Sequence, residues 1–244
     1  MNKAIDLYQP KSNLMLDALD KVAVEAHMAR VEKGFKTFLI TGCNATVGTT
    51  TNAINLSICM ALSGWKTVLI DADIRKKSDY KHLSDENAFG LTDYLDGMAS
   101  YEDILTETNY KNLTYIPSGI KIDNSVRLLC SENMEKLLKR LKTEFDYIIL
   151  DMSSLNVTPD ATILLPIVDG TILVSALNET TRRDLQYGIN KLSRYPEKIV
   201  GMVINKVETK DFRQYQTDYD HFEPKKMKRR VSRALKGKGV RENA

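Results

Sequence analysis

Short apolar runs recur along this 244-residue chain, and the stretches between them place apolar residues at helical spacing. The apolar runs predict strands at 38–40, 68–70, 113–117, 146–151, 171–176 and 198–205. The other stretches predict helices at 13–31, from the threonines at 49–51 to Gly64, and at 91–95, 101–105, 132–145 and 181–192. Because the strands are continuously apolar and alternate with helices, the pattern predicts an α/β fold with a mostly parallel central sheet and helices on both faces.

Several residues are suited to the start of a helix, either as the capping residue or at the first helical position. Ser100 is expected to cap a helix at 101–105, and Ser131 to cap the amphipathic helix at 132–145. Thr158 followed by Pro159 predicts another helix start, because proline fits the first helical position. Residues 1–12 are polar and are expected to lack regular structure.

The stretch 38–73 suggests a nucleotide-binding unit. It reads FLITGCNATVGTTTNAINLSICMALSGWKTVLIDAD, which is a strand, a loop around Gly48, a helix and a second strand. This order is the opening unit of a P-loop domain, so the predicted fold is P-loop NTPase-like. In such a unit the loop amides and the positive end of the helix dipole favour a phosphate group.

The loop matches the P-loop pattern only in part. The pattern requires glycine, four residues, glycine, lysine, and then serine or threonine. Gly48 and Thr50 fit, but Cys43 occupies the first glycine position and Thr49 occupies the lysine position. Because Thr49 carries no charge for the phosphates, the loop alone is equally compatible with a connection that binds no ligand.

Three carboxylates strengthen the nucleotide interpretation. Asp71, Asp73 and Asp151 each follow an apolar strand. The carboxyl ends of parallel strands meet at one edge of a sheet, so these side chains are expected to converge beside Gly48. Thr50 lies where a hydroxyl can bind a phosphate-bound Mg²⁺, and the carboxylates can reach the same metal ion.

Composition restricts the class of protein. The chain has 27% charged and 43% hydrophobic residues, which is ordinary for a globular protein of one domain. Its three cysteines are widely spaced, as expected for reduced thiols rather than a disulfide framework. No apolar run approaches the roughly 20 residues of a membrane span, and MNKAIDLYQPKSN lacks a signal-peptide core, so we expect a cytoplasmic protein.

The positive charge is concentrated near the C-terminus. Between Lys225 and Arg241 there are nine basic residues and no acidic one, whereas the rest of the chain carries 26 basic and 32 acidic residues. Met227, Val231 and Leu235 recur every four residues, which would form an apolar stripe on a basic helix. Such a tail can lie on an anionic membrane surface or remain solvated and disordered, and nonspecific nucleic-acid binding is the least favoured of the three interpretations.

Seven segments together resemble one protein family. The segment VLIDADIRK (68–76) resembles the Asp-x-Asp-x-Arg motif of the bacterial tyrosine kinases of capsule and exopolysaccharide assembly, the BY-kinases. The further segments that resemble this family, in order and at similar intervals, are GLTDYLDG (90–97), NLTYIPSG (112–119), FDYIILD (145–151), Asp160-Ala161, VDGTILV (168–174) and GMVINKV (201–207). The likeness covers roughly residues 35–207.

The resemblance implies a site for ATP or ADP with Mg²⁺. By resemblance, Thr50 binds Mg²⁺, Asp71 assists the metal and takes the proton from an attacking tyrosine hydroxyl, Asp73 supports the metal site, and Asp151 holds metal-bound water. The residues that would bind the nucleotide are Gly48, Thr49, Thr50, Thr51 and, at the base, Asn205. The tail tyrosines Tyr215 and Tyr219 are the expected phosphoacceptors.

The resemblance also implies a biological role. It predicts an N-terminal segment and helix (1–34), a P-loop kinase-like domain (35–210) and a tail with tyrosines and then basic residues (211–244). The expected activity is tyrosine autophosphorylation that regulates capsular or exopolysaccharide biosynthesis and export. The protein would work with a membrane adaptor at the inner face of the cell membrane, and it could form a homo-oligomer.

Two departures from the family pattern leave other functions open. Thr46, Val47 and Thr49 replace the usual glycine, glutamate and lysine of the loop, which would impair catalysis. The N-terminal helix has Met28 and Val31 where the family carries arginines used in ring assembly. The alternatives are an inactive pseudokinase that acts as a scaffold for a membrane adaptor, and a partitioning or positioning P-loop ATPase.

Overall fold

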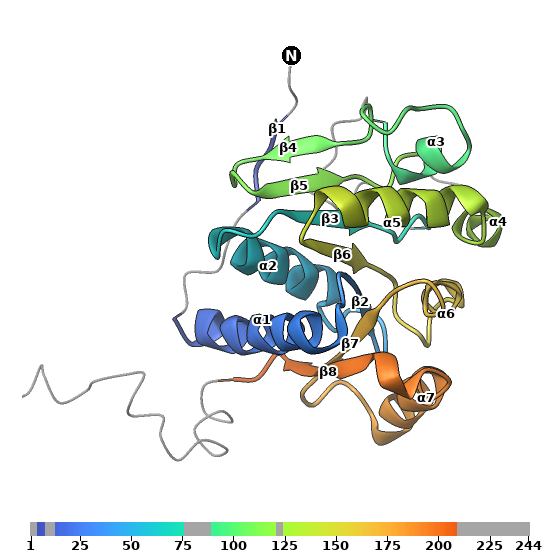
Figure 1. Cartoon of the computed structure of the whole chain (residues 1–244). Helices are drawn as coiled ribbons and strands as arrows, with labels where there is room; N and C mark the ends of the chain where they lie inside the picture. Colours follow the sequence, from blue (N-terminus) through green and yellow to red (C-terminus); the bar gives the residue numbers. More distant parts are fainter. Residues whose placement is uncertain (1–3, 8–12, 76–88, 121–123, 209–244) are drawn as a thin grey trace, which may run out of the picture. The chain divides into compact units, whose positions relative to one another are not determined.

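The central sheet is the frame on which the rest of the chain is arranged. The computed structural model describes residues 4–7, 13–75, 89–120 and 124–208 (Figure 1). These residues form an eight-stranded sheet in the order β1-β4-β5-β3-β6-β2-β7-β8. The strands are β1 (Ala4–Ile5), β2 (Thr37–Gly42), β3 (Thr67–Asp71), β4 (Thr106–Thr108), β5 (Leu113–Ile116), β6 (Tyr147–Asp151), β7 (Gly170–Ala176) and β8 (Ile199–Asn205). Only β4 and β5 pair antiparallel, so the predicted mostly parallel sheet is confirmed.

Helices cover both faces of the sheet. They are α1 (Asn13–Lys33), α2 (Thr49–Leu62), α3 (Leu91–Leu95), α4 (Ser125–Leu129), α5 (Glu132–Glu144), α6 (Asp160–Leu164) and α7 (Arg182–Leu192), followed by a short 3-10 helix, Pro196–Lys198. Buried residues of α1 and α2 pack in one core, and those of α3 to α7 pack in a second core. The prediction of helices on both faces is therefore confirmed.

Alternate residues of the central strands point into the two cores. On β3, Leu69 packs with α1 and α2, whereas Val68 and Ile70 pack with α3 to α7. On β6, Ile149 and Leu150 divide in the same way. This alternation, which is inherent to a pleated strand, determines the face on which each strand-end side chain lies.

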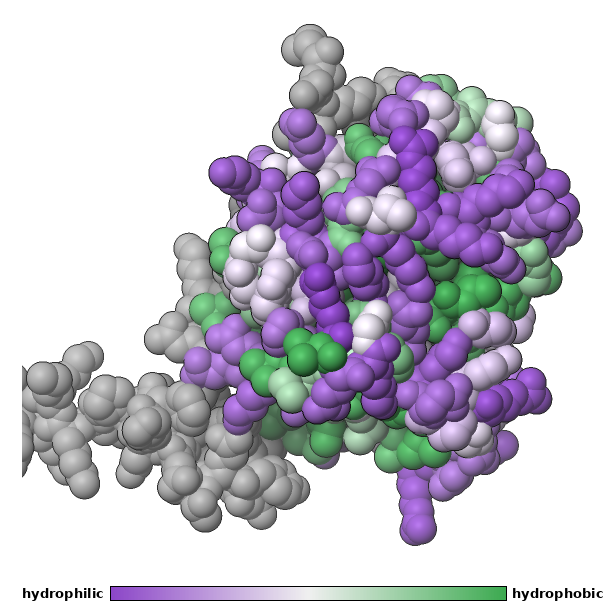
Figure 2. Space-filling view, in the orientation of Figure 1, coloured by the Kyte–Doolittle hydropathy of each residue, from purple (hydrophilic) through white to green (hydrophobic). Residues whose placement is uncertain are grey.

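The surface helices match their sequence patterns. Met134, Leu137, Leu138 and Leu141 of α5 are all buried, and the Ser131 hydroxyl accepts a hydrogen bond from the Met134 amide, as predicted. With the apolar residues of such helices turned inward, hydrophilic residues dominate the face seen in Figure 2. None of the helices in the described part of the chain combines the length and the apolarity needed to cross a membrane.

Two predictions near the ends of β4 and α6 are wrong. Residues 101–104 form a turn rather than a helix, although the Ser100 hydroxyl accepts from the Asp103 amide at 3.3 Å and the Ser100 amide donates to the Asp103 carboxylate at 2.9 Å, as at a helix start. Thr158 does not cap α6: Pro159 occupies the N-cap, and the Thr158 hydroxyl shares a 2.7 Å hydrogen bond with Ser153.

Four short elements were not predicted, one of which is the 3-10 helix Pro196–Lys198. The first residues were expected to lack structure, but Ala4–Ile5 form β1, which pairs with β4. The strand β4 and the helix α4 were also missed, and α4 is capped by the Asn124 side chain, which accepts from the Arg127 amide at 3.3 Å.

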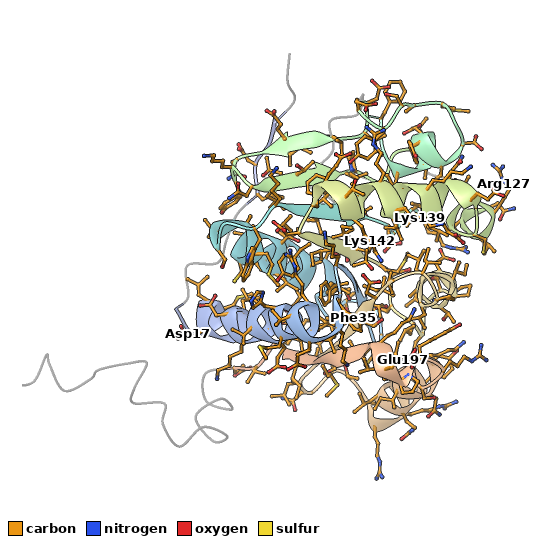
Figure 3. The ribbon with its side chains drawn as sticks, viewed as in Figure 1. Asp17, Phe35, Arg127, Lys139, Lys142 and Glu197 are labelled. Carbon is orange, nitrogen blue, oxygen red and sulfur yellow. The ribbon has the colours of Figure 1, made fainter. Side chains whose placement is uncertain are left out.

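A charged cluster lies at the amino-terminal edge of β2, near the start of β7. The Asp169 carboxylate accepts from the amides of Lys36 and Thr37 at 2.9 and 3.0 Å and from Lys142 of α5 at 2.7 Å. Figure 3 labels Lys142 on α5. Burial by itself raises the pKa of Asp169, but the hydrogen bonds from these donors outweigh it and lower the pKa below its ordinary value. The cluster thus ties α5 to the sheet at the edge where β2 begins.

The chain separates into two compact units, Met1–Lys206 and Val207–Ala244. The sheet and all of the named helices belong to the first unit. Of the second unit the structure describes only residues 207 and 208.

Candidate functional site

The loop between β2 and α2 ends in a glycine that no other residue could replace without strain. Gly48 is the N-cap of α2 and has a φ of 89°, in the left-handed region. A Cβ placed on Gly48 would also clash with the amide nitrogen of Asn205. Both the backbone angle and the close approach therefore require glycine here.

Side chains from three neighbouring connections hold this loop in place. Asn205, at the end of β8, donates to the Val47 carbonyl at 2.8 Å. Ser154, which follows β6, donates to the Asn44 carbonyl at 2.7 Å, and Thr180, which follows β7, donates to the Asn44 side-chain oxygen at 2.8 Å. Asn205 was predicted to contact a base, and in this structure its amide group lies against the loop itself.

The backbone amides of the loop are available to an anion. The Cys43 amide donates to the Val174 carbonyl and the Asn52 amide to the Gly48 carbonyl, at 2.8 and 3.0 Å. Between these two, residues 45 and 46 form a turn, and within the described residues the amides of residues 48–51 at the start of α2 donate to no acceptor. They precede or begin the 14-residue helix α2, whose dipole favours negative charge at this end, so the loop fits a phosphate group.

The three threonines that open α2 differ in exposure. Thr49, at the position of the P-loop lysine, is only 8% exposed, and its hydroxyl oxygen lies 2.8 Å from where a Cβ on Gly42 would be. Thr50 is half-buried and Thr51 is exposed. Thr50 therefore sits in the first turn of the helix and is only partly buried, as a metal-binding hydroxyl there would need to be.

The structure brings Asp71 and Asp151 side by side. The two residues end β3 and β6 and are direct partners in the parallel register, and both are 3% exposed. Because Leu69 and Ile149 pack with α2, the alternation along each strand places Asp71 and Asp151 on the α2 face as well. Asp73 follows two residues after Asp71 and is also buried.

Two donors among the described residues contact the carboxylate of Asp71. The Asp73 amide donates to its Oδ1 at 3.3 Å, and the hydroxyl of Tyr115, on β5, donates to its Oδ2 at 3.5 Å. Burial, followed by the negative charges of Asp71 and Asp151, raises the pKa of Tyr115 well above its ordinary value. The Tyr115 hydroxyl therefore keeps its proton and acts as a donor.

The cation nearest in sequence to these carboxylates is bound to another acid. Arg75 forms a bidentate pair with Asp160, with Nε–Oδ2 and Nη2–Oδ1 distances of 2.6 and 3.0 Å. The hydrogen bond to Asp160 is the main reason that the pKa of Arg75 is raised. Lys76, Tyr215, Tyr219 and the basic residues from Lys225 to Arg241 lie outside the described residues.

The side chains present fit a Mg²⁺ ion that is carried by a nucleotide. Within the described ranges, no group of three or more His, Cys, Asp or Glu side chains could hold a metal ion by itself. Mg²⁺ is usually bound through one or two carboxylates, several waters and the substrate phosphates. A hydroxyl from Thr50 with the carboxylates of Asp71 and Asp151 matches that requirement.

Sequence reasoning missed the residues that connect the site to its surroundings. Tyr115, Ser154 and Thr180 touch the carboxylate or the loop, and none of them stands out from a motif. Tyr115 could have been found from its place in an apolar strand, because a tyrosine two residues after Leu113 lies on the same face as Leu113. Finding it would also have required knowing that β5 lies beside β3.

Comparisons with known proteins extend the likeness over most of the chain. A family model described as an AAA domain matches residues 35–199. Tyrosine-protein kinase CpsD of Streptococcus pneumoniae serotype 4 is 35% identical over 176 residues, which cover 71% of this chain and 77% of CpsD. The crystal structure of the VpsO kinase domain is 28% identical, with a TM-score of 0.70 over 80% of this chain and 96% of that domain.

A more distant likeness concerns the fold alone. The septum site-determining protein MinD of Pyrococcus horikoshii, solved in complex with Mg-ADP, is 19% identical with a TM-score of 0.58. This likeness covers 75% of the chain and 77% of MinD.

The sheet, the loop ahead of α2 and the paired carboxylates define a P-loop NTPase-like α/β domain. The family model covers well over half of the chain, and CpsD exceeds 30% identity over most of its own length. The chain belongs to the BY-kinase family of bacterial tyrosine kinases.

Proposed function

We propose that this chain is a Mg²⁺- and ATP-dependent tyrosine autokinase-like protein in which phosphoryl transfer is slow. The observation that carries the proposal is the register that pairs Asp71 with Asp151 on the face where α2 begins. Phosphoryl transfer depends mainly on positioning and on neutralising phosphate charge. Carboxylates and a helix N-terminus at one edge of the sheet supply both requirements.

Each group at this edge has a role in the proposal. The amides of residues 48–51 bind the phosphates, with Gly48 giving them room and Thr51 at the exposed rim. Thr50, Asp71 and Asp151 would hold Mg²⁺, which when bound would neutralise part of the phosphate charge. Asp71 accepts the proton of the attacking tyrosine hydroxyl, and the Asp73 amide helps to orient it.

The missing lysine is the reason to expect slow transfer. Loss of one charge-stabilising donor at a transition state costs about 3 kcal/mol, or about a hundredfold in rate. Arg75 is the described cation closest in sequence, but its Nε and Nη2 donors are bound to Asp160, whose charge offsets its own. These features also favour a second candidate function, a nucleotide-binding regulatory protein without transfer.

Calorimetry with ATP and ADP, with and without Mg²⁺, tests the binding half of the proposal. We expect Mg²⁺-dependent binding that Asp71→Asn and Asp151→Asn weaken at least tenfold. Asp146→Asn is the matched control, because Asp146 directly precedes β6 whereas Asp151 ends it. No binding by the wild-type chain at millimolar nucleotide would overturn the proposal.

Phosphotyrosine detection after incubation with Mg²⁺ and ATP tests the transfer half. Autophosphorylation should be slow, should disappear in Asp71→Asn, and should be lost when Tyr215 and Tyr219 are both changed to phenylalanine. Nucleotide binding without any phosphotyrosine would instead establish the regulatory function.

The biological setting forms part of the same proposal. The likeness to capsule and exopolysaccharide kinases supports a role in regulating polysaccharide export beside a membrane adaptor, from the cytoplasmic side and as a homo-oligomer. The basic residues from Lys225 to Arg241 would contact the membrane surface. Co-sedimentation of the full chain with anionic but not with neutral vesicles would support this contact.

A further inference from the structure

Tyr115 reaches the centre of the site from a strand that takes no part in the loop. It lies on β5 opposite Leu69 of β3, and the parallel register carries its side chain toward the end of β3. The side chain is 2% exposed and packs in the core shared with α1 and α2. Its hydroxyl ends 3.5 Å from Oδ2 of Asp71.

The hydroxyl limits how the Asp71 carboxylate can turn. Among the described residues, the Asp73 amide donates to Oδ1 of this carboxylate and the Tyr115 hydroxyl donates to Oδ2. Rotation about the terminal bond of Asp71 would break both hydrogen bonds.

We propose that Tyr115 is a positioning residue, whose hydroxyl holds the Asp71 carboxylate in the orientation that binds nucleotide-bound Mg²⁺ and accepts the proton of the attacking tyrosine. This inference rests on the proposed function of Asp71. Donors to a metal-binding side chain commonly change metal affinity or activity 10- to 100-fold when removed. The 3.5 Å distance places Tyr115 at the lower end, at about tenfold.

The test compares two variants that each remove one buried tyrosine hydroxyl. Tyr115→Phe removes the donor to Asp71. Tyr147→Phe is the matched control, because Tyr147 is buried at the start of β6, on the other side of β3, and its hydroxyl pairs with His27 at 2.8 Å. Thermal unfolding of both variants reports the purely structural cost of losing a buried hydroxyl.

Calorimetry then separates positioning from folding. We expect Tyr115→Phe to weaken binding of ADP in the presence of Mg²⁺ about tenfold and to leave metal-free ADP binding unchanged. Tyr147→Phe should change neither affinity. In an Asp71→Asn background, the Tyr115→Phe change should have no further effect on Mg²⁺-dependent binding, because the group that Tyr115 orients is no longer a carboxylate.

The possible outcomes distinguish this inference from the function on which it rests. Wild-type affinity of Tyr115→Phe for ADP with Mg²⁺ would overturn the role of Tyr115 and leave the proposed function standing. An equal loss with and without Mg²⁺ would also overturn it, because a general structural effect would explain the result. Failure of the wild-type chain to bind any nucleotide with Mg²⁺ would overturn both.

Discussion

Arg75 and Asp160 form an ion pair, and removing one of them should affect the stability of the fold very differently from removing the other. Arg75 follows β3 and Asp160 begins α6, so the pair connects two segments beside the site. The Asp160 side chain is 2% exposed, whereas the Arg75 side chain is 37% exposed. Removal of the arginine therefore leaves a buried carboxylate without its cation, and neutralising the carboxylate leaves a cation that water can reach.

The magnitudes follow from this difference in burial. Removing one member of a buried pair and leaving the other charged costs about 3–5 kcal/mol. The first turn of α6 favours a negative charge by about 0.5 kcal/mol, so Arg75→Met should lower the free energy of unfolding by about 3 kcal/mol. Asp160→Asn keeps the shape and a hydrogen-bond acceptor, and we expect a loss of about 1 kcal/mol.

Urea unfolding at pH 7 measures both values under the same conditions. Arg127→Met is a suitable control, because Arg127 pairs with Asp96 at 2.8 Å while 62% of its own side chain is exposed. That control should change the free energy of unfolding by well under 1 kcal/mol. Equal losses for Arg75→Met and Asp160→Asn, or a larger loss for Asp160→Asn, would refute the reasoning from burial.

Three further changes test the loop and the charged cluster at the opposite edge. Thr46 has a left-handed φ of 62°, which is strained for a β-branched residue, so Thr46→Gly should raise the free energy of unfolding in urea by about 1 kcal/mol after the entropy cost of glycine. Thr49→Lys should speed autophosphorylation about a hundredfold in a phosphotyrosine assay. The lowered pKa of Asp169 contributes stability that is present above the ordinary carboxyl pKa and lost as pH falls through the folded value. Asp169→Asn should therefore cost about 2 kcal/mol in urea unfolding at pH 7, and less below about pH 4.

The central strands were predictable because a strand buried on both faces is a continuous run of apolar residues, which can be recognised from that segment alone. All six predicted strands are present, and every residue of β7 is buried. The strands β1 and β4 have only two and three residues and include polar positions such as Glu107, so their pairing depends on a partner far along the chain. The helix predicted after Ser100 was wrong although its capping hydrogen bond is present, because the segment is only one turn long before β4 begins at Thr106.

The site was predictable to the extent that parallel sheets gather strand ends at one edge. That rule alone was enough to expect Asp71 and Asp151 near Gly48. The rule does not say which strands are neighbours in the sheet. The contacts of Tyr115 and Arg75 depend on that strand order. Apolar periodicity cannot supply the order, because β5, β3 and β6 have similar patterns and differ only in their partners.

The loop and the carboxylates together imply an unusual dependence on the metal ion. When the P-loop carries a lysine, the lysine and Mg²⁺ together neutralise the phosphate charge. In this chain Thr49 has no charge, and Arg75 is bound to Asp160. Loop amides and the dipole of α2 contribute only partial charges. Hydrogen bonds from Ser154, Thr180 and Asn205 hold the loop without a ligand, so little binding energy is spent on ordering it. Removal of Mg²⁺ should therefore lower the nucleotide affinity of the wild-type chain more than it lowers the affinity of the Thr49→Lys variant.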